Sequence, residues 1–449
     1  MRRRLFGRKR PIGHSFHRAL RAAAAIAFGP VLLAACAAPP AAAEVERIVY
    51  ANWEYGPAQQ EMHRALVAEF NKAYAARGWQ VEYRTTEYDK IIVEIAAGTS
   101  PDVVNSYREP ELGPQGALLD LAPFLKREAS LFGDALTPVV FDYYHLGDSV
   151  WAMPQAISVE DFVYYNLDLF DQAGLAYPDG QWTWETFLDA ARKLTIDSNG
   201  DGIPEQYGTT SQWLRQRSGW VYAAGAAEWA LDGSGPQYSD PAVLEAIQFV
   251  IDLERVHGVV PPPGSPVLSN MLSGLPFSTG KVAMNPGAVW EASVYSAVDG
   301  LRWDVGPPLI KERRGIRVVA FPLDVVATTK HPEVAWEFVK FAAMSPQANA
   351  LVLRYHYGIP VRRDTALRLE GPLRKMAEYA MQWAWVDKPW PGRNEVDGQL
   401  IRSQLSEVLA GTKGLAAAAE EIMRLAPGIL AKYPSVHRSL PAGSPARGR

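Results

Sequence analysis

Hydrophobic positions in residues 45–107 alternate between a strand pattern and a helix pattern. Runs rich in β-branched and aromatic residues predict three strands, at residues 47–53, 79–85 and 101–107. Between the first two strands, hydrophobic residues recur at helical spacing: Met62, Leu66, Phe70 and Tyr74. A second helix is predicted after the second strand, and Gly98 ends it. Strands and helices that alternate without hairpin turns are typical of a parallel, doubly wound sheet, so we predict an α/β fold.

The rest of the chain continues the α/β pattern. Residues 146–170 predict one strand up to Met153, a break at Pro154 and a second strand around residues 162–165. Thr183 and the pair Asp240–Pro241 are typical helix starts. Helices are predicted at residues 183–194, 239–258, 331–344, 345–358 and 415–433.

The carboxyl ends of the first and third strands form a predicted ligand edge. In doubly wound sheets, ligands bind beyond these strand ends. Residues 53–55 lie at the end of the first strand and residues 105–109 at the end of the third. We therefore expect ligand contacts from these two short segments.

The N-terminus has the order of an export signal. Residues 1–21 carry eight Lys or Arg and no acid, and residues 22–35 form an apolar run shorter than the roughly 20 residues of a spanning helix. Residues 33–36, Leu-Ala-Ala-Cys, resemble a bacterial lipobox. We predict a signal peptide at residues 1–35, lipidation of Cys36 and a tether at residues 36–44. An ordinary signal peptide cleaved after a nearby alanine is the alternative, and Sec or twin-arginine export both stay open.

Charge and cysteine content narrow the class of protein. Cys36 is the only cysteine, so no disulfide can form within one chain. Removing the eight basic residues of the signal from 45 leaves 37 against 49 acidic residues, a net charge of about −12. This acidity disfavours nucleic-acid binding. The roughly 410 residues after Cys36 exceed one ordinary core and predict two or more domains.

Two segments carry candidate enzyme chemistry. Glu160 and Asp161 adjoin a predicted cleft, and a glycosidase needs such a pair of carboxylates. Adjacent strand residues point to opposite faces, so the two can flank one bond only if a bulge intervenes. Residues 147–150, Gly-Asp-Ser-Val, partly match a hydrolase signature, but the histidines after Cys36 are scattered singly, and a turn is the better interpretation.

Residues 197–208 resemble a calcium loop. Oxygen-bearing side chains stand at the first, third, fifth and ninth positions: Asp197, Asn199, Asp201 and Glu205. Gly208 stands at the twelfth position, where a bidentate Glu belongs. A metal-free turn is the alternative. Structural calcium is left open, and no other cofactor is expected.

Seven segments, taken in order, resemble family 1 of the extracellular solute-binding proteins, the receptors that deliver sugars to ATP-driven importers. They are EIAAGTSPDVVNSY, GALLDLAPFLK, GDSVWAMPQA, FVYYNLDLFDQAG, WTWETFLDAARKLT, GKVAMNPGAVW and HPEVAWEFVKFAAMSPQ. Residues 313–328 depart from the family, which usually has a Gly-Gly pair there.

The resemblance implies a two-lobed periplasmic-binding-protein fold, with a ligand cleft between lobes that hinge crossings join. It places residues 44–156 and 311–364 in the first lobe and residues 157–310 and 365–435 in the second. Residues 436–449 are predicted to be a disordered tail.

The resemblance also implies which residues contact the ligand. They are Trp53, Glu54, Asn105, Tyr107 and Glu109 at the strand ends, Gln155 at the crossing, and Trp220, Trp290 and Trp385 in the second lobe. An aromatic face suits the C–H face of a sugar ring, while carboxylates and amides pair with its hydroxyls.

The function implied is a lipid-anchored, exported receptor of an ABC importer, without catalytic activity. Its expected partners are a carbohydrate, two permease subunits and the membrane that holds the lipid anchor, but no nucleic acid, and a monomer is expected. A polyol or glycerol-phosphate receptor is an alternative, with Arg108 and Arg393 as candidate phosphate ligands. A secreted glycan-processing enzyme is the alternative from another class, and a cell-surface adhesin or sensor is a third.

Overall fold

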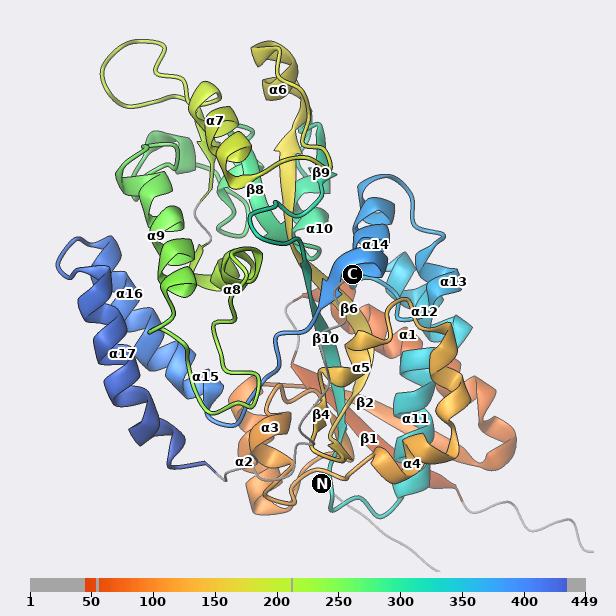
Figure 1. Ribbon diagram of the computed structural model, residues 1–449. Helices are drawn as coiled ribbons and strands as arrows, with labels where there is room; N and C mark the ends of the chain where they lie inside the picture. Colours follow the sequence, from red (N-terminus) through yellow and green to blue (C-terminus); the bar gives the residue numbers. More distant parts are fainter. Residues whose placement is uncertain (1–44, 54–55, 211–212, 434–449) are drawn as a thin grey trace, which may run out of the picture. The chain divides into compact units, whose positions relative to one another are not determined.

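One mixed sheet of nine strands organises the computed structural model, which describes residues 45–53, 56–210 and 213–433 (Figure 1). Its main path is β2 (Trp79–Thr86), β1 (Glu46–Trp53), β3 (Val103–Val104), β10 (Ile316–Val325), β6 (Met153–Asn166), β8 (Val282–Ala288) and β7 (Tyr207–Thr209). Two further strands pair beside it, β11 (Ala384–Trp385) with β10 and β9 (Trp303–Gly306) with β6. The predicted α/β class is confirmed.

Helices connect and cover these strands. The longer ones are α1 (Pro57–Ala73), α2 (Tyr88–Ala97), α7 (Trp184–Lys193), α8 (Trp213–Ala223), α9 (Pro241–Arg255), α11 (Pro332–Met344), α12 (Pro346–Arg354), α14 (Gly371–Trp383), α16 (Arg402–Leu409) and α17 (Leu415–Leu430). Shorter α-helices are α3 (Glu109–Leu112), α4 (Ala122–Arg127), α5 (Val139–Asp142), α6 (Leu167–Ala173), α10 (Glu291–Ser296), α13 (Arg363–Ala366) and α15 (Arg393–Glu395). Of the helices described, none has the length and apolar character needed to cross a membrane.

The predicted helix starts are confirmed. Thr183 caps α7 by a capping box, in which its hydroxyl accepts from the backbone N–H of Thr186 and the Thr186 hydroxyl accepts from the backbone N–H of Thr183. The Asp240 carboxylate accepts from the backbone N–H of Ala242 at the start of α9. Residues 147–150 form the turn and second strand of a hairpin between β4 (His145–Leu146) and β5 (Ser149–Val150), so the turn interpretation is confirmed as well.

Strand directions agree with the prediction in one part of the sheet only. β1 runs parallel to β2 and β3, as predicted. β10 runs antiparallel to both β3 and β6, so the sheet is mixed. The predicted break at Pro154 is wrong, because β6 continues through it. Pro154 pairs with Pro322 beside a register shift, where the ladder skips Gln155 of β6, a place where a ladder can lack an N–H donor.

Two large hydrophobic cores lie against this sheet, and β6 contributes to both, while a third, small cluster joins Ile91, Val104 and Val326. Phe162 and Tyr164 belong to a first core with β1, β10 and helices α1, α11 and α14. Val163 and Tyr165 belong to a second core with helices α7, α9 and α17. Alternate side chains of a strand point to opposite faces, which is why one strand serves two cores.

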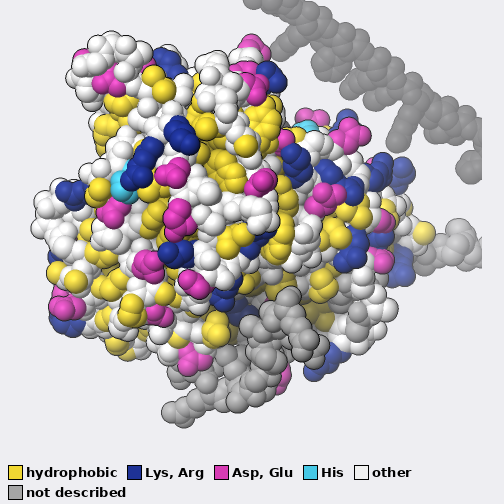
Figure 2. Space-filling view, turned by 45° about the horizontal axis from the view of Figure 1, so that its top comes forward, with side chains coloured by type: hydrophobic (Ala, Val, Ile, Leu, Met, Phe, Trp, Pro, Cys, Tyr) yellow, Lys and Arg dark blue, Asp and Glu magenta, His cyan; other side chains and the backbone are white. Residues whose placement is uncertain are grey.

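The predicted signal peptide, the lipidation site Cys36, the tether and the tail fall outside the described residues. The lobe boundaries stay a prediction. On the face that Figure 2 displays, acidic and basic side chains are interspersed around hydrophobic ones.

Candidate functional site

Three predicted residues meet where β1 and the segment after β3 end. The Trp53 Nε1–H donates to the backbone oxygen of Asn105 at 3.0 Å. The Trp53 ring packs edge-on against Tyr107, with ring centroids 5.8 Å apart. Tyr107 has a φ of 50°, a left-handed conformation that is uncommon for a bulky residue. This strain is typical of binding sites. Glu54 falls outside the described residues.

Glu109 lies just beyond this edge and forms a buried carboxyl pair with Asp324 of β10. Glu109 is 3% exposed and Asp324 is fully buried. Burial raises the pKa of Asp324 to about 7, and burial together with the Asp324 charge holds the pKa of Glu109 well above its usual range. Asp324 Oδ2 also accepts from the backbone N–H of Ser106 at 2.8 Å. The pair therefore holds protons into the neutral pH range.

Glu109 also lines a small pocket, here called the Trp151 pocket. It encloses about 200 Å³, counting open solvent, and its lining residues are Glu109, Pro110, Tyr143, Tyr144, His145, Leu146, Trp151 and Pro389. Within the described residues, Glu109 Oε1 and Trp151 Nε1 have no hydrogen-bond partner. An acceptor and a donor are thus buried without partners at one pocket.

A second hollow, the Trp184 pocket, is larger. It encloses about 370 Å³ of space that no atom fills, counting the solvent at its mouth. Its lining residues are Asp161, Val163, Trp184, Gly219, Trp220, Ala223, Pro286, Pro308, Leu309 and Gly315. The predicted contact Trp220 belongs to this set. The walls are mainly apolar and aromatic, with one carboxylate, which is the composition of small-molecule sites.

A bulge in β6 changes the expected geometry of Glu160 and Asp161. The ladder between β6 and β8 shifts register between Glu160 and Phe162, and Asp161 takes a φ of 75°. The expectation that the two carboxylates face apart is therefore wrong. Both approach Arg317 of β10, since Glu160 forms an ion pair with it and Asp161 Oδ2 lies 3.8 Å from its Nε.

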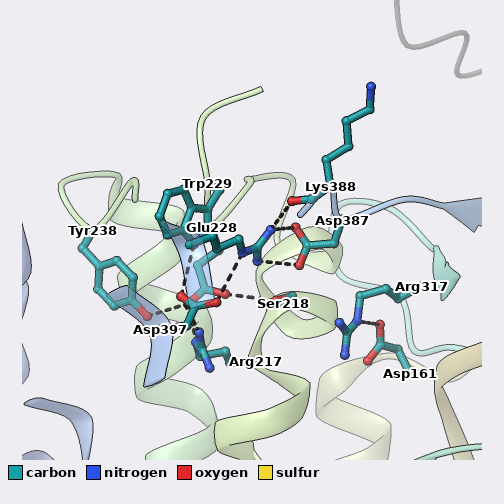
Figure 3. Close-up of polar contacts among 11 residues, drawn as sticks. Asp161, Arg217, Ser218, Glu228, Trp229, Tyr238, Arg317, Asp387, Lys388 and Asp397 are labelled. Atoms are coloured by element: carbon teal, nitrogen blue, oxygen red, sulfur yellow. Dashed lines mark hydrogen bonds and ion pairs between the residues drawn. The ribbon is translucent and has the colours of Figure 1, made fainter. Parts of the chain in front are cut away.

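Figure 3 shows a buried arginine–carboxylate cluster between α8 and the segment that follows β11. Arg393 donates in a bidentate manner to Asp387, at 2.6 and 2.7 Å, and contacts Asp397 at 3.2 Å. Arg217 pairs with Glu228, and its Nη2 lies 3.1 Å from Asp397. Both guanidinium groups are thus neutralised by carboxylates inside the protein.

Three other predicted contacts lie elsewhere. Gln155 is 1% exposed and its Nε2 lies 3.4 Å from His63 Nδ1. Trp290 stands before α10 and packs, partly buried, against the first core. Trp385 stacks in parallel on Tyr222, with centroids 4.2 Å apart. Among the residues described, none of these three lines either pocket.

Arg317, Asp324, Trp151 and Trp184 are site residues that the sequence interpretation missed. Arg317 and Asp324 lie on β10, about 160 to 220 residues away in sequence from the side chains they meet. Nothing in their local sequence marks them. The sequence around Trp184 gives only a weak indication of a binding role. Trp184 directly follows the helix cap Thr183, and a tryptophan at that position is typical of an ordinary core residue.

The calcium-like loop brings Asp197, Asp201 and Glu205 together at the surface, with ligand oxygens within 4.8 Å of one another. The loop already uses these oxygens internally. Asp197 accepts from the N–H groups of Gly200 and Gly202, and Glu205 accepts from the Asn199 amide at 2.7 Å. Calcium binding stays a prediction.

Comparison with known proteins places the chain in a family. The model of the family described as "Bacterial extracellular solute-binding protein" matches residues 57–349. A mannitol-binding protein of Pseudomonas aeruginosa is 24% identical over 264 residues, 52% of this chain and 58% of the relative. An sn-glycerol-3-phosphate-binding periplasmic protein of Rhizobium meliloti is 24% identical over 217 residues, 44% and 48% of the two chains. The chain thus spans about half the length of these curated relatives.

Solved structures share the fold. The substrate-binding protein Lmo0181 of Listeria monocytogenes, in complex with cycloalternan, aligns with a TM-score of 0.72 at 20% identity, covering 86% of this chain and 98% of that one. The maltose/maltodextrin-binding domain MalE of Bdellovibrio bacteriovorus, bound to maltotriose, aligns with a TM-score of 0.66 at 19% identity, covering 86% and 99%. The predicted two-lobed binding-protein fold is confirmed.

Proposed function

Because the chain belongs to the bacterial extracellular solute-binding protein family, we propose that it captures a neutral, hydroxyl-rich solute, a sugar or short oligosaccharide, outside the cytoplasm. The observation that carries this proposal is the chemistry of the two pockets. Each combines aromatic walls with a buried carboxylate that has an oxygen free to accept a hydrogen bond from a ligand. Hydroxyl groups donate to such oxygens, and aromatic faces suit the C–H surfaces of sugar rings.

A phosphate ester fits these pockets less well. A phosphate needs an available guanidinium or ammonium group. The candidate Arg393 is occupied by Asp387 and Asp397, and Arg108 donates to the Tyr88 hydroxyl at 3.1 Å. The Asp161 carboxylate at the Trp184 pocket, where it is ionised, would also repel a phosphate. These contacts therefore favour a receptor for a neutral solute over a receptor for a phosphate ester.

The proposed mechanism is binding with hinge closure and no covalent step. Strands β6 and β10 are the proposed crossings between lobes, and they run antiparallel through a register of paired residues from Met153 to Glu160. A solute that touches both lobes stabilises the closed state only by its extra contacts there. Glu160 is held in an ion pair with Arg317, which argues against its use as a catalytic acid.

We further propose that the mature protein is monomeric, anchored through lipidated Cys36 and docks two permease subunits. These parts of the proposal rest on the family and on residues 1–44 of the sequence.

The test is a thermal-shift panel of the purified protein with mannobiose, maltotriose, D-mannitol and sn-glycerol 3-phosphate. A ligand at 100 times its Kd stabilises by about 2.7 kcal/mol, which is several degrees in Tm if unfolding is reversible. We expect a shift with a sugar, and mass spectrometry to recover that sugar intact. Cleavage of the sugar would show that the protein is an enzyme and would overturn the receptor proposal. A Tm shift with sn-glycerol 3-phosphate alone would overturn the proposal of a neutral ligand.

A further inference from the structure

Asp161 holds its carboxylate at the Trp184 pocket at a conformational cost. A φ of 75° is strained for a residue with a Cβ atom, and aspartate is one of the few that tolerate it. The bulge at this position also interrupts the ladder between β6 and β8. Backbone strain of this kind persists only where the surrounding structure enforces it, and it concentrates at functional sites.

Gly219 makes room for that carboxylate. It lies inside α8, where a glycine destabilises the helix by roughly 1 kcal/mol relative to alanine. It does not have a positive φ, so conformational freedom does not explain it. A Cβ atom placed there would come closer than 3.0 Å to the Asp161 carboxyl atoms, a distance that real Cβ atoms do not adopt. The helix thus accepts a glycine so that the Asp161 carboxylate can lie against it.

The polar groups at the pocket are incompletely satisfied, although Asp161 forms a long ion pair with Arg317. The Asp161 side chain is 8% exposed, and within the described residues neither of its oxygens makes a hydrogen bond. Figure 3 marks its ion pair with Arg317, whose Nε lies 3.8 Å away, which is too far for a hydrogen bond. Trp184 is 2% exposed and its Nε1–H has no acceptor in the described structure. A buried acceptor and a buried donor at one apolar pocket are each unfavourable unless a ligand completes them.

We propose that the Trp184 pocket is the subsite that selects the ligand, by taking one sugar ring whose hydroxyl donates to Asp161 while another of its oxygens accepts from the Trp184 Nε1–H. This inference rests on the proposed function and adds the residues that determine specificity. The pocket is small and opens to solvent at its mouth, so a single ring is the largest unit that it could take. Trp220, Pro286 and Leu309 supply the apolar walls for its C–H surfaces.

The protonation of Asp161 gives the proposal a second readout. Burial raises its pKa to about 7, with Glu160 on the same strand and Asp387 after β11 adding to the rise, while Arg317 on β10 opposes it. On α8, the residue facing it is Gly219. A hydroxyl donor favours the ionised carboxylate. Affinity should therefore strengthen about tenfold between pH 6 and pH 8, as the ionised fraction rises through a pKa near 7.

The experiment is titration calorimetry of wild type and variants with mannobiose, maltotriose and D-mannitol. Asp161→Asn keeps the shape and removes the charge, and Trp184→Phe keeps a ring and removes the N–H. We expect Asp161→Asn to weaken binding at least tenfold and to abolish its pH dependence, and Trp184→Phe to weaken it several-fold. Matched controls are Asp148→Asn at the exposed hairpin turn and Trp182→Phe, which packs on the second core outside the pocket.

Stability separates a ligand group from a structural one. Removing a buried carboxylate with a raised pKa should raise the Tm of Asp161→Asn at pH 8 while its affinity falls. A residue with a purely structural role would lose Tm and affinity together. Wild-type affinity in both Asp161→Asn and Trp184→Phe would overturn the subsite and leave the receptor standing. Failure of wild type to bind any of these three probes would overturn the proposed sugar function itself, and the subsite with it.

Discussion

Asparagine at position 324 should stabilise the protein at alkaline pH. Asp324 is fully buried beside Glu109, and its pKa is raised from an ordinary 3.8 to about 7. A raised pKa means that the folded state holds the proton more tightly than the unfolded chain does. The contribution of Asp324 to the free energy of unfolding is therefore fully present below about pH 4, and it is lost as the pH rises through about 7. A rise of the pKa from 3.8 to about 7 corresponds to about 4 kcal/mol of stability lost above pH 7.

Asp324→Asn removes this loss without removing the local hydrogen bond. The asparagine oxygen can still accept from the backbone N–H of Ser106, and its amide can donate to Glu109. The assay is urea unfolding followed by circular dichroism at pH 4.5, 6, 7 and 8. We expect equal free energies of unfolding within about 1 kcal/mol at pH 4.5, and a gain that grows towards about 4 kcal/mol at pH 8.

The control is Asp102→Asn, a carboxylate that already accepts from the backbone N–H of Val49 at 2.8 Å and the Thr329 hydroxyl at 2.7 Å. Because its oxygens are satisfied, this change should not gain stability at pH 8. An Asp324→Asn variant that is less stable than wild type at pH 8, or that gains equally at both ends of the pH range, would refute the reasoning.

Three further changes test local features. Gly113→Ala should lower the free energy of unfolding in urea by about 1–3 kcal/mol, because the added Cβ would overlap the Trp151 indole. As a control, Gly428→Ala in α17 meets no atom within 4 Å and should raise it by about 0.5–1 kcal/mol. An unchanged stability of Gly113→Ala would contradict this packing. Thr183→Ala should lose about 1 kcal/mol with the α7 cap, and Thr183→Ser should retain it; equal losses in both would exclude capping as the cause. Cys36→Ser should move the protein from the detergent phase to the aqueous phase in a phase-partition assay, and retention in the detergent phase would rule out the proposed anchor.

Local sequence predicted what depends on local physics. Capping residues, helical spacing and terminal glycines located α1, α7 and α9, and the strand-end rule brought Trp53, Asn105 and Tyr107 together. What it missed depends on partners far along the chain. Pro154 predicts a break, yet it lies in a continuous strand, because β6 accommodates it beside a register shift at Gln155, opposite Pro322 of β10.

The conformation of Asp161 was not predictable for the same reason. The bulge that turns it towards Arg317 arises from pairing with β8, more than 100 residues later. The glycine that admits its carboxylate lies in α8, and a glycine inside a helix shows in sequence only as a weak helix position. Pairs of this kind become visible when the packing of both elements is known.

β6 links the two hydrophobic cores through alternate side chains, with Phe162 and Tyr164 in one and Val163 and Tyr165 in the other. If one core unfolds, β6 loses its packing on that face, and the other core then loses the support of the same strand. Calorimetry should accordingly record one melting transition for residues 45–433, despite a length that usually allows stepwise melting. A fragment carrying only one core would expose the other face of β6 to water, so this protein cannot be divided into independently stable halves at that strand.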